Sequence, residues 1–316
     1  MEVAFTKCHG SGNDFPLIDA RAIALDDAAW GGMARALADR GGPVGGDGIL
    51  LLTAGQDGAA FGMRMFNSDG SEAETCLNGL RCVARAGFEA LGIDRATVQL
   101  KTSRAEVSRA PDLAAGVYTV RTRAGPASIQ PEDVGIRVAA PVLNAPVPGL
   151  PSAGAFTGVA MPNPHLIRFV GMVDEAELVA LGQWCEARPD LLVDRANVSF
   201  VERREGGLFV RTHERGVGLT DACGSAMAAS VFAAGLTGRV PFGTTVTVFN
   251  PGGLVRGCAE APGDGGMVTI AGNATVEWTG RVTVDVGSGT AFDLIVTARW
   301  PDEVAAWDAV RASAAA

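Results

Sequence analysis

Two cysteines, Cys76 and Cys223, stand where acid–base chemistry would be favoured. Each follows a polar loop and precedes a stretch rich in alanine and other small residues, which predicts that each cysteine opens a helix. Unpaired N–H groups and the helix dipole favour negative charge at a helix N-terminus, so a thiol placed there can ionise below its ordinary pKa of about 8.5. The same N–H groups can bind a carboxylate.

Two such thiols could invert a carbon atom that carries a carboxylate. One thiolate would remove the α-proton while the opposite thiol donates a proton to the other face, and the helix N–H groups would stabilise the enediolate formed between these steps. We therefore interpret Cys76 and Cys223 as an acid/base pair. The other four cysteines are interpreted as packing residues, the usual role of a free cysteine: they are Cys8, Cys82, Cys185 and Cys258.

The two cysteines belong to an internal repeat. Residues 47–87 align without gaps to residues 194–234, an offset of 147 positions that superimposes Cys76 on Cys223 and Asn67 on Glu214. Both copies predict the same order of strand, turn, strand, polar loop, cysteine and helix. The predicted strands are residues 49–52 and 61–66 in the first copy, and 198–201 and 208–212 in the second.

A repeat this long indicates two similar domains and not a solenoid. The 316 residues suffice for two domains with separate cores. We place the first domain at residues 1–127 plus about 274–316, and the second at residues 128–273. The stretch 301–316 predicts a short terminal helix to which no function is given.

Composition excludes several classes of function. The formal net charge of -9 argues against a nucleic-acid partner, and no apolar run approaches the roughly 18 residues of a membrane helix. The first residues lack the pattern of a signal peptide, so we expect a cytoplasmic protein. Three dispersed histidines and no Cys-x-x-Cys pair predict no metal site. Only Lys7 and Lys101 could form a pyridoxal-phosphate Schiff base, and neither position suits it, so we expect no cofactor.

Around these cysteines the chain resembles the diaminopimelate epimerase family. The matching segments cover the chain from about residue 3 to residue 285 and are highly specific in combination. They are His9-Gly10-Ser11-Gly12-Asn13-Asp14-Phe15, Phe66-Asn67-Ser68-Asp69-Gly70-Ser71-Glu72, Cys76-Leu77-Asn78-Gly79 with Arg81-Cys82, Asn163-Pro164-His165, Asn197-Val198, Glu214-Arg215-Gly216-Val217-Gly218, Ala222-Cys223-Gly224-Ser225, Asn250-Pro251-Gly252-Gly253 and residues 274–280.

The resemblance implies an α/β (α+β) fold of two pseudo-symmetric domains, each a curved, mostly antiparallel sheet or barrel wrapped around a central helix. It implies that Cys76 and Cys223 are the catalytic pair, tuned by His165 and Glu214. The reacting carboxylate would bind the amides at Leu77, Asn78, Gly224 and Ser225. The far end of diaminopimelate would be held by Asn13, Asn67, Asn163, Asn197, Glu214 and Arg215.

Physical chemistry agrees for two of these residues, because Arg215 suits a carboxylate and Glu214 an ammonium group. Leu77 departs from the family, which usually has glycine after the first cysteine. Leucine is tolerable there only in helical geometry and not at a positive φ.

Three alternatives remain at this stage. The chain could be a racemase of another amino acid, such as histidine or proline, on the same scaffold. It could also be an isomerase of the same fold without a cysteine pair, which Cys76 and Cys223 argue against, or a binding module without catalysis. A small amino-acid substrate and a homodimer are further expectations.

Overall fold

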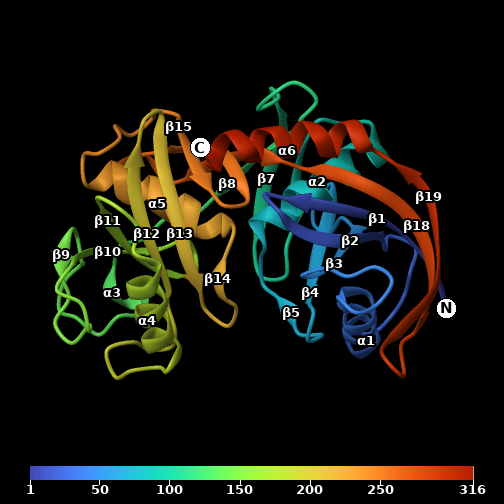
Figure 1. Cartoon of the computed structure of the whole chain (residues 1–316), viewed down its shortest axis with the longest axis horizontal. Coiled ribbons are helices and arrows are strands. Elements are labelled where there is room, and N and C mark those ends of the chain that lie inside the picture. Colours follow the sequence, from blue (N-terminus) through green and yellow to red (C-terminus); the bar gives the residue numbers. More distant parts are fainter. Residues whose placement is uncertain (316) are drawn as a thin grey trace. The chain divides into compact units, whose positions relative to one another are not determined.

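Six α-helices and nineteen strands form the described residues, 1–315, of the computed structural model (Figure 1). The strands form a large mixed sheet, so the fold is mixed α/β. Contacts between residues divide the chain into two units. Unit 1 comprises Met1–Thr122 and Ala271–Ala312, and unit 2 comprises Arg123–Ile270 with the end of the chain from Ser313 onward.

Unit 1 begins with a hairpin and contains two helices between its strands. Its first elements are β1 (Glu2–Gly10), β2 (Asn13–Asp19), α1 (Asp27–Ala38), β3 (Gly48–Ala54), β4 (Phe61–Asn67), β5 (Glu72–Ala73), α2 (Leu77–Leu91), β6 (Arg95–Gln99), β7 (Arg104–Ala110) and β8 (Thr119–Ala124). Strand β8 runs into unit 2. After unit 2 the chain returns to form β18 (Thr275–Asp285), β19 (Thr290–Arg299) and α6 (Pro301–Ala315).

Unit 2 likewise consists of strands with helices between them. Its elements are α3 (Pro131–Val134), β9 (Ala145–Pro146), β10 (Ala155–Ala160), β11 (Pro164–Val170), α4 (Glu175–Glu186), β12 (Asn197–Arg204), β13 (Gly207–Glu214), β14 (Gly218–Thr220), α5 (Gly224–Leu236), β15 (Val246–Asn250), β16 (Gly253–Ala259), a short 3-10 helix (Pro262–Asp264) and β17 (Val268–Asn273).

The repeat predicted from the sequence is confirmed element by element. In unit 1, β2 pairs parallel to β3, β3 pairs antiparallel to β4, and β4 pairs parallel to β6. In unit 2, β11, β12, β13 and β15 pair with the same senses in the same order. In each copy a short strand precedes a helix whose N-cap is a cysteine.

Helix α2 packs against β1, β2, β3, β4, β6 and β7, and it can do so because of its small residues. A Cβ atom at Gly79 would lie 2.7 Å from the Leu50 side chain of β3, and one at Gly87 would lie 2.6 Å from the Phe61 ring of β4. Glycine thus permits the close helix–strand approach that fixes where α2 begins. Helix α5, rich in alanine, likewise contacts β10, β11, β12, β13, β15 and β16.

Helices α1 and α4 each begin at an aspartate that accepts a backbone hydrogen bond. Asp26 accepts from Ala29 N at 2.8 Å, and Asp174 accepts from Ala176 N and Glu177 N. Helix α1 covers a cluster that includes Phe5, Ile18, Ile49 and Trp30. A second cluster in unit 2 includes Leu178 and Leu181 of α4.

The end of the chain forms more than the predicted terminal helix. Strands β18 and β19 make an antiparallel pair before α6. On α6, Glu303 forms an ion pair with Arg85 of α2, and the buried ring of Trp307 lies 6.1 Å from the His9 ring. The part of the C-terminal helix up to Ala312 is therefore an integral part of unit 1.

Candidate functional site

Cys76 is the N-cap residue of α2, as the sequence predicts. Its φ of -144° is extended, and its Sγ accepts a hydrogen bond from Gly79 N at 3.3 Å. The same sulfur lies 3.6 Å from Asn13 Oδ1, to which the thiol can donate. A half-buried thiol thus takes the place that serine or aspartate usually has at a helix start.

Asn13 is held toward this sulfur by a charged network. Its Nδ2 donates to Asp47 Oδ2, and Asp47 is in turn paired with Arg40 at 2.8 Å. Arg40 and the buried Lys7 also bind Asp14. Burial favours protonation of Asp14, but these two cations prevail and lower its pKa. Asn13 therefore approaches Cys76 with a fixed orientation.

The two residues after Cys76 have backbone N–H groups at the free end of α2. Leu77 is the first helical residue, so its geometry is the one in which leucine is tolerable. Asn78 is buried and accepts from Arg81 through Oδ1 at 3.1 Å. The N–H groups of a first helical turn can bind an anion.

Asn67 is the last residue of β4, where the loop that leads to Cys76 begins. Its Nδ2 donates to Ser71 Oγ at 3.0 Å, and its backbone N–H donates to Ser71 O. Gly70, at a φ of 87°, makes the turn between them. Asn67 is therefore a half-buried turn residue in this structure.

Cys223 is the N-cap residue of α5 and is more buried than Cys76, at 6% exposure. Burial raises the pKa of its thiol well above the ordinary value, and the negative charge of Glu214 raises it further. The Ser225 hydroxyl, 3.5 Å away, and the Ala226 amide act in the opposite direction. The effects of burial and of Glu214 prevail, so the environment of Cys223 favours the protonated thiol.

His165 lies in a buried amide cluster of unit 2. Its Nε2 is 3.0 Å from Asn163 Oδ1 and 3.5 Å from Asn197 Nδ2, because parallel β11 and β12 place His165 beside Asn197. Burial lowers the pKa of His165 to about 3, and Arg215 adds to the effect. The ring is neutral at ordinary pH.

Glu214 and Arg215 stand at the turn between β13 and β14. The Arg215 backbone N–H donates to Asn197 Oδ1 at 2.9 Å, which connects this turn to the His165 cluster. Both side chains are half-buried.

Each unit thus brings several of its predicted residues together. Unit 1 brings Asn13 and Asn78 to Cys76, with Asn67 in the preceding loop. Unit 2 groups Asn163, His165, Asn197 and Arg215 in one cluster, and Glu214 with Gly224 and Ser225 around Cys223.

Sequence reasoning assigned no role to Arg81 or Asp47. Arg81 is completely buried in α2, and Asp47 orients Asn13. A charged residue within the apolar run from Leu80 to Val83 was the available signal for Arg81, whereas Asp47 resembled an ordinary loop residue.

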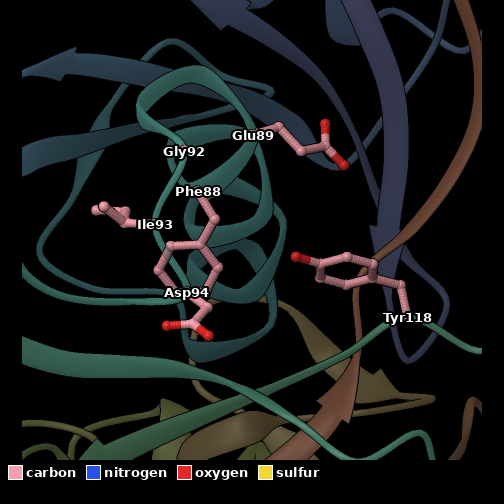
Figure 2. Close-up of a pocket in the computed structure, with 6 residues that line it drawn as sticks. All are labelled: Phe88, Glu89, Gly92, Ile93, Asp94 and Tyr118. Carbon is pink, nitrogen blue, oxygen red and sulfur yellow. The ribbon is translucent and has the colours of Figure 1, made fainter.

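One surface pocket belongs to unit 1 alone and is separate from these groups. It has a volume of about 440 Å³ and is lined by residues at the far end of α2 and by Tyr118 (Figure 2). A helix rises about 1.5 Å per residue, so the 15-residue α2 separates this pocket from Cys76 by roughly 20 Å. It is too distant to take part in chemistry at the thiol.

The described residues contain neither a membrane-spanning helix nor a metal-binding cluster. No helix among them is long and apolar enough to cross a membrane. No cluster of three or more histidine, cysteine, aspartate or glutamate side chains within residues 1–315 could hold a metal ion.

Comparison with known proteins agrees with this geometry. The sequence model of the family described as diaminopimelate epimerase matches residues 5–139 and 157–288. Diaminopimelate epimerase of Listeria innocua serovar 6a is 37% identical over 300 residues, covering 91% of each chain. That of Clostridium acetobutylicum is 35% identical, covering 90% of this chain and 87% of its own.

Solved structures share the fold at lower identity. A phenazine biosynthesis protein of the PhzF family from Bacillus anthracis has a TM-score of 0.65 at 14% identity, covering 90% of this chain and 100% of its own. A hydroxyproline epimerase from Agrobacterium vitis has a TM-score of 0.62 at 14% identity, covering 90% of this chain and 92% of its own. The full-length relatives and the matched family model together establish that this chain belongs to the diaminopimelate epimerase family.

Proposed function

We propose that this isomerase interconverts LL- and meso-2,6-diaminopimelate without a cofactor, by moving the α-proton between Cys76 and Cys223. The observation that carries the proposal is the cysteine at the N-cap of the matched helices α2 and α5, in a chain of this family. The product would serve lysine biosynthesis, the role that the family implies.

The reaction needs the substrate carboxylate on the helix N-termini. The backbone N–H groups of Leu77 and Asn78 on α2, and of Gly224 and Ser225 on α5, are the groups proposed to bind it. As one sulfur removes the α-proton, negative charge moves onto the carboxylate oxygens. Fixed N–H donors stabilise that enediolate more than the starting acid, which lowers the barrier.

The surroundings of the thiols support opposite resting roles. Cys223 lies where burial and Glu214 favour a proton on sulfur, so it is suited to donate. Cys76 accepts an N–H bond at its helix start, which suits the anion. The reverse reaction exchanges the roles, and Glu214 beside Cys223 can accept the proton that this sulfur must then lose.

The distal amino-carboxylate group would be held by the polar residues around the two thiols. Arg215 would bind the carboxylate and Glu214 the ammonium group. The amide side chains of Asn13, Asn67, Asn163 and Asn197 would complete the site. His165, buried and neutral, is proposed to orient the amide of Asn163 by donating from Nε2 to its Oδ1, 3.0 Å away, and not to transfer protons.

Three further expectations, on the domains, the location and the oligomeric state, belong to the same proposal. The two units are proposed to be pseudo-symmetric epimerase domains, each with a curved sheet around α2 or α5, with boundaries near residues 127 and 273. A cytoplasmic location is proposed from the family's biosynthetic role. A homodimer is also proposed, and the exposed Phe292 and Ile295 of β19, at 47% and 59% exposure, offer an apolar strand surface for it. Light scattering should give twice the chain mass, and Ile295→Glu should reduce it.

Exchange of the α-proton tests the chemistry directly. The protein is incubated with LL-diaminopimelate in heavy water, and α-deuteration and meso product are followed. Cys76→Ala and Cys223→Ala should each lower epimerisation by about a hundredfold to ten-thousandfold, the usual contribution of general acid–base catalysis.

Cys82→Ala is the matched control, because this thiol lies on the same helix but away from its start. It should retain most activity. Near-parental turnover in either N-cap variant would remove that cysteine from the mechanism. Faster racemisation of histidine or proline than of diaminopimelate would leave the two-cysteine chemistry in place and overturn the substrate.

A further inference from the structure

Arg81 is a buried cation whose hydrogen-bond acceptors within residues 1–315 include no carboxylate. Its side chain is 0% exposed, and its guanidinium donates only to neutral oxygens. These acceptors are Asn273 O at 2.9 Å, Ser11 Oγ at 3.0 Å, Asn78 Oδ1 at 3.1 Å and Leu77 O at 3.5 Å.

This position is unfavourable for a cation in two respects. Removing a guanidinium from water without a paired anion costs free energy, and burial lowers the pKa of Arg81 to about 10. The bond to Leu77 O shows that the guanidinium reaches back to the first turn of α2, where the helix dipole already carries positive charge. A negative charge nearby would offset both of these costs.

Two cysteine sulfurs interact electrostatically with this charge, that of Cys82 more strongly than that of Cys76, and negative charge on either stabilises the cation. Of the two, Cys76 is the one that opens the helix and contacts Asn13. Cys82 is 3% exposed, so solvent and substrate do not reach it.

We propose that Arg81 is a positioning residue for the reaction: its buried charge stabilises the thiolate of Cys76 and adds to the positive potential that binds the substrate carboxylate. This role of Arg81 rests on the proposed function, in which Cys76 is the reacting thiol. Arg81 acts through Cys76 and does not itself exchange a proton.

The same side chain holds the hairpin turn that carries Asn13. Ser11 adopts a φ of 55° at this turn, which is uncommon for a residue other than glycine. Arg81 binds its hydroxyl, and Asn273 Oδ1 binds its backbone N–H at 2.7 Å. Arg81 therefore links the turn, and so Asn13, to the helix that carries Cys76.

Arg85 supplies the comparison within the same helix. It lies four residues later and is paired with Glu303 and Glu89, as buried or half-buried arginines commonly are. Its charge is thereby neutralised locally. Arg85→Met is thus a matched control for Arg81→Met: the same substitution on the same helix, without loss of an unpaired charge.

The experiment measures how readily the Cys76 thiol ionises, by its alkylation, and not the rate of catalysis. The chain is treated with iodoacetamide at a series of pH values without substrate, and alkylation of the Cys76 peptide is quantified by mass spectrometry. Arg81→Met should raise the pH midpoint of Cys76 alkylation by about one unit or more, as expected when an opposite charge is lost nearby. Arg81→Lys should keep it within about half a unit, and Arg85→Met should leave it unchanged.

A folded Arg81→Met protein whose midpoint does not move would overturn the proposal and leave Arg81 with a packing role. If that variant does not fold, Arg81→Gln decides, because it keeps a polar side chain for the neighbouring oxygens but removes the charge. Its midpoint should rise by about one unit, and a parental value would overturn the proposal. A fully active Cys76→Ala enzyme would instead contradict the proposed function while leaving the alkylation result intact.

Discussion

At the scale of the residue, the two cysteines are alike in backbone and different in surroundings. Both are extended N-cap residues, but Cys76 is half-buried with Gly79 N and Asn13, whereas Cys223 is buried beside Glu214. An epimerase that runs in both directions needs one thiol and one thiolate at any moment. Different environments on equivalent helices provide that difference without a metal or a cofactor in the proposed mechanism.

Arg215 is the residue on which the choice of substrate should depend most. Loss of one charge-assisted contact costs about 1.5–3 kcal/mol, or about one to two decades in kcat/KM. Arg215→Met should therefore lower kcat/KM for LL-diaminopimelate at least about tenfold. Lysine, which lacks the distal carboxylate, should be a very poor substrate of the parental enzyme, because the site's polar groups would be left unpaired.

Steady-state assays with both amino acids check this prediction. Arg203→Met serves as a control, because Arg203 is an exposed residue of β12 that the site does not include. Equal turnover of lysine and diaminopimelate by the parental enzyme would contradict the assignment of Arg215 to a distal carboxylate.

At the scale of the element, the sequence predicted what depends on local pattern. The cysteine at each helix start, the two strands before it and the 147-residue offset all follow from periodicity and turn residues, and the structure confirms them. The β18–β19 hairpin was not predicted, because half-exposed strands with a bulge give weak alternation. The roles of Arg81 and Asp47 were also missed, since both depend on partners far along the chain.

Helix α6 should contribute strongly to stability although it lies beyond the matched family region. Trp307 is 2% exposed and packs near the His9 ring. Truncation of a buried tryptophan to alanine typically costs about 3–5 kcal/mol. Trp307→Ala should lower the free energy of unfolding of unit 1 by about this amount, as measured by urea denaturation.

Asp308→Ala on the exposed side of the same helix is the control and should change the free energy of unfolding by less than about 0.5 kcal/mol. An unchanged urea midpoint for Trp307→Ala would mean that α6 is dispensable for the stability of unit 1.

At the scale of the whole molecule, each unit contains a buried histidine that must stay neutral. Burial lowers the pKa of His9 to about 4 and that of His165 to about 3. Unfolded histidine titrates near 6.5, so between that pH and the folded pKa the unfolded chain binds more protons. The stability that these neutral histidines contribute is therefore fully present above about pH 6.5 and is lost as the pH falls toward their folded pKa values.

Each histidine should reduce the free energy of unfolding by about 2 kcal/mol between pH 7 and pH 5. Urea titrations at the two pH values measure the loss. His165→Gln should be less stable at pH 7 but should lose less stability on acidification, because one of the buried histidines no longer titrates. The same loss in parent and variant would show that His165 is protonated in the folded protein.

The proposed reaction also makes a prediction about the two thiols together. Proton transfer to opposite faces of one α-carbon requires both sulfurs to come close to the same small centre. Without substrate, two such sulfurs should be able to form a disulfide, giving up two electrons and two protons to an oxidant such as diamide. Oxidation should then inactivate the enzyme, and dithiothreitol should restore it.

Peptide mapping should find Cys76 joined to Cys223 in the oxidised sample, and bound diaminopimelate should slow the reaction by occupying the space between them. Cys82→Ala should behave as the parent, since its thiol is buried within α2. Inactive oxidised protein in which both N-cap thiols are still free would argue against their close approach, and with it against direct transfer between them.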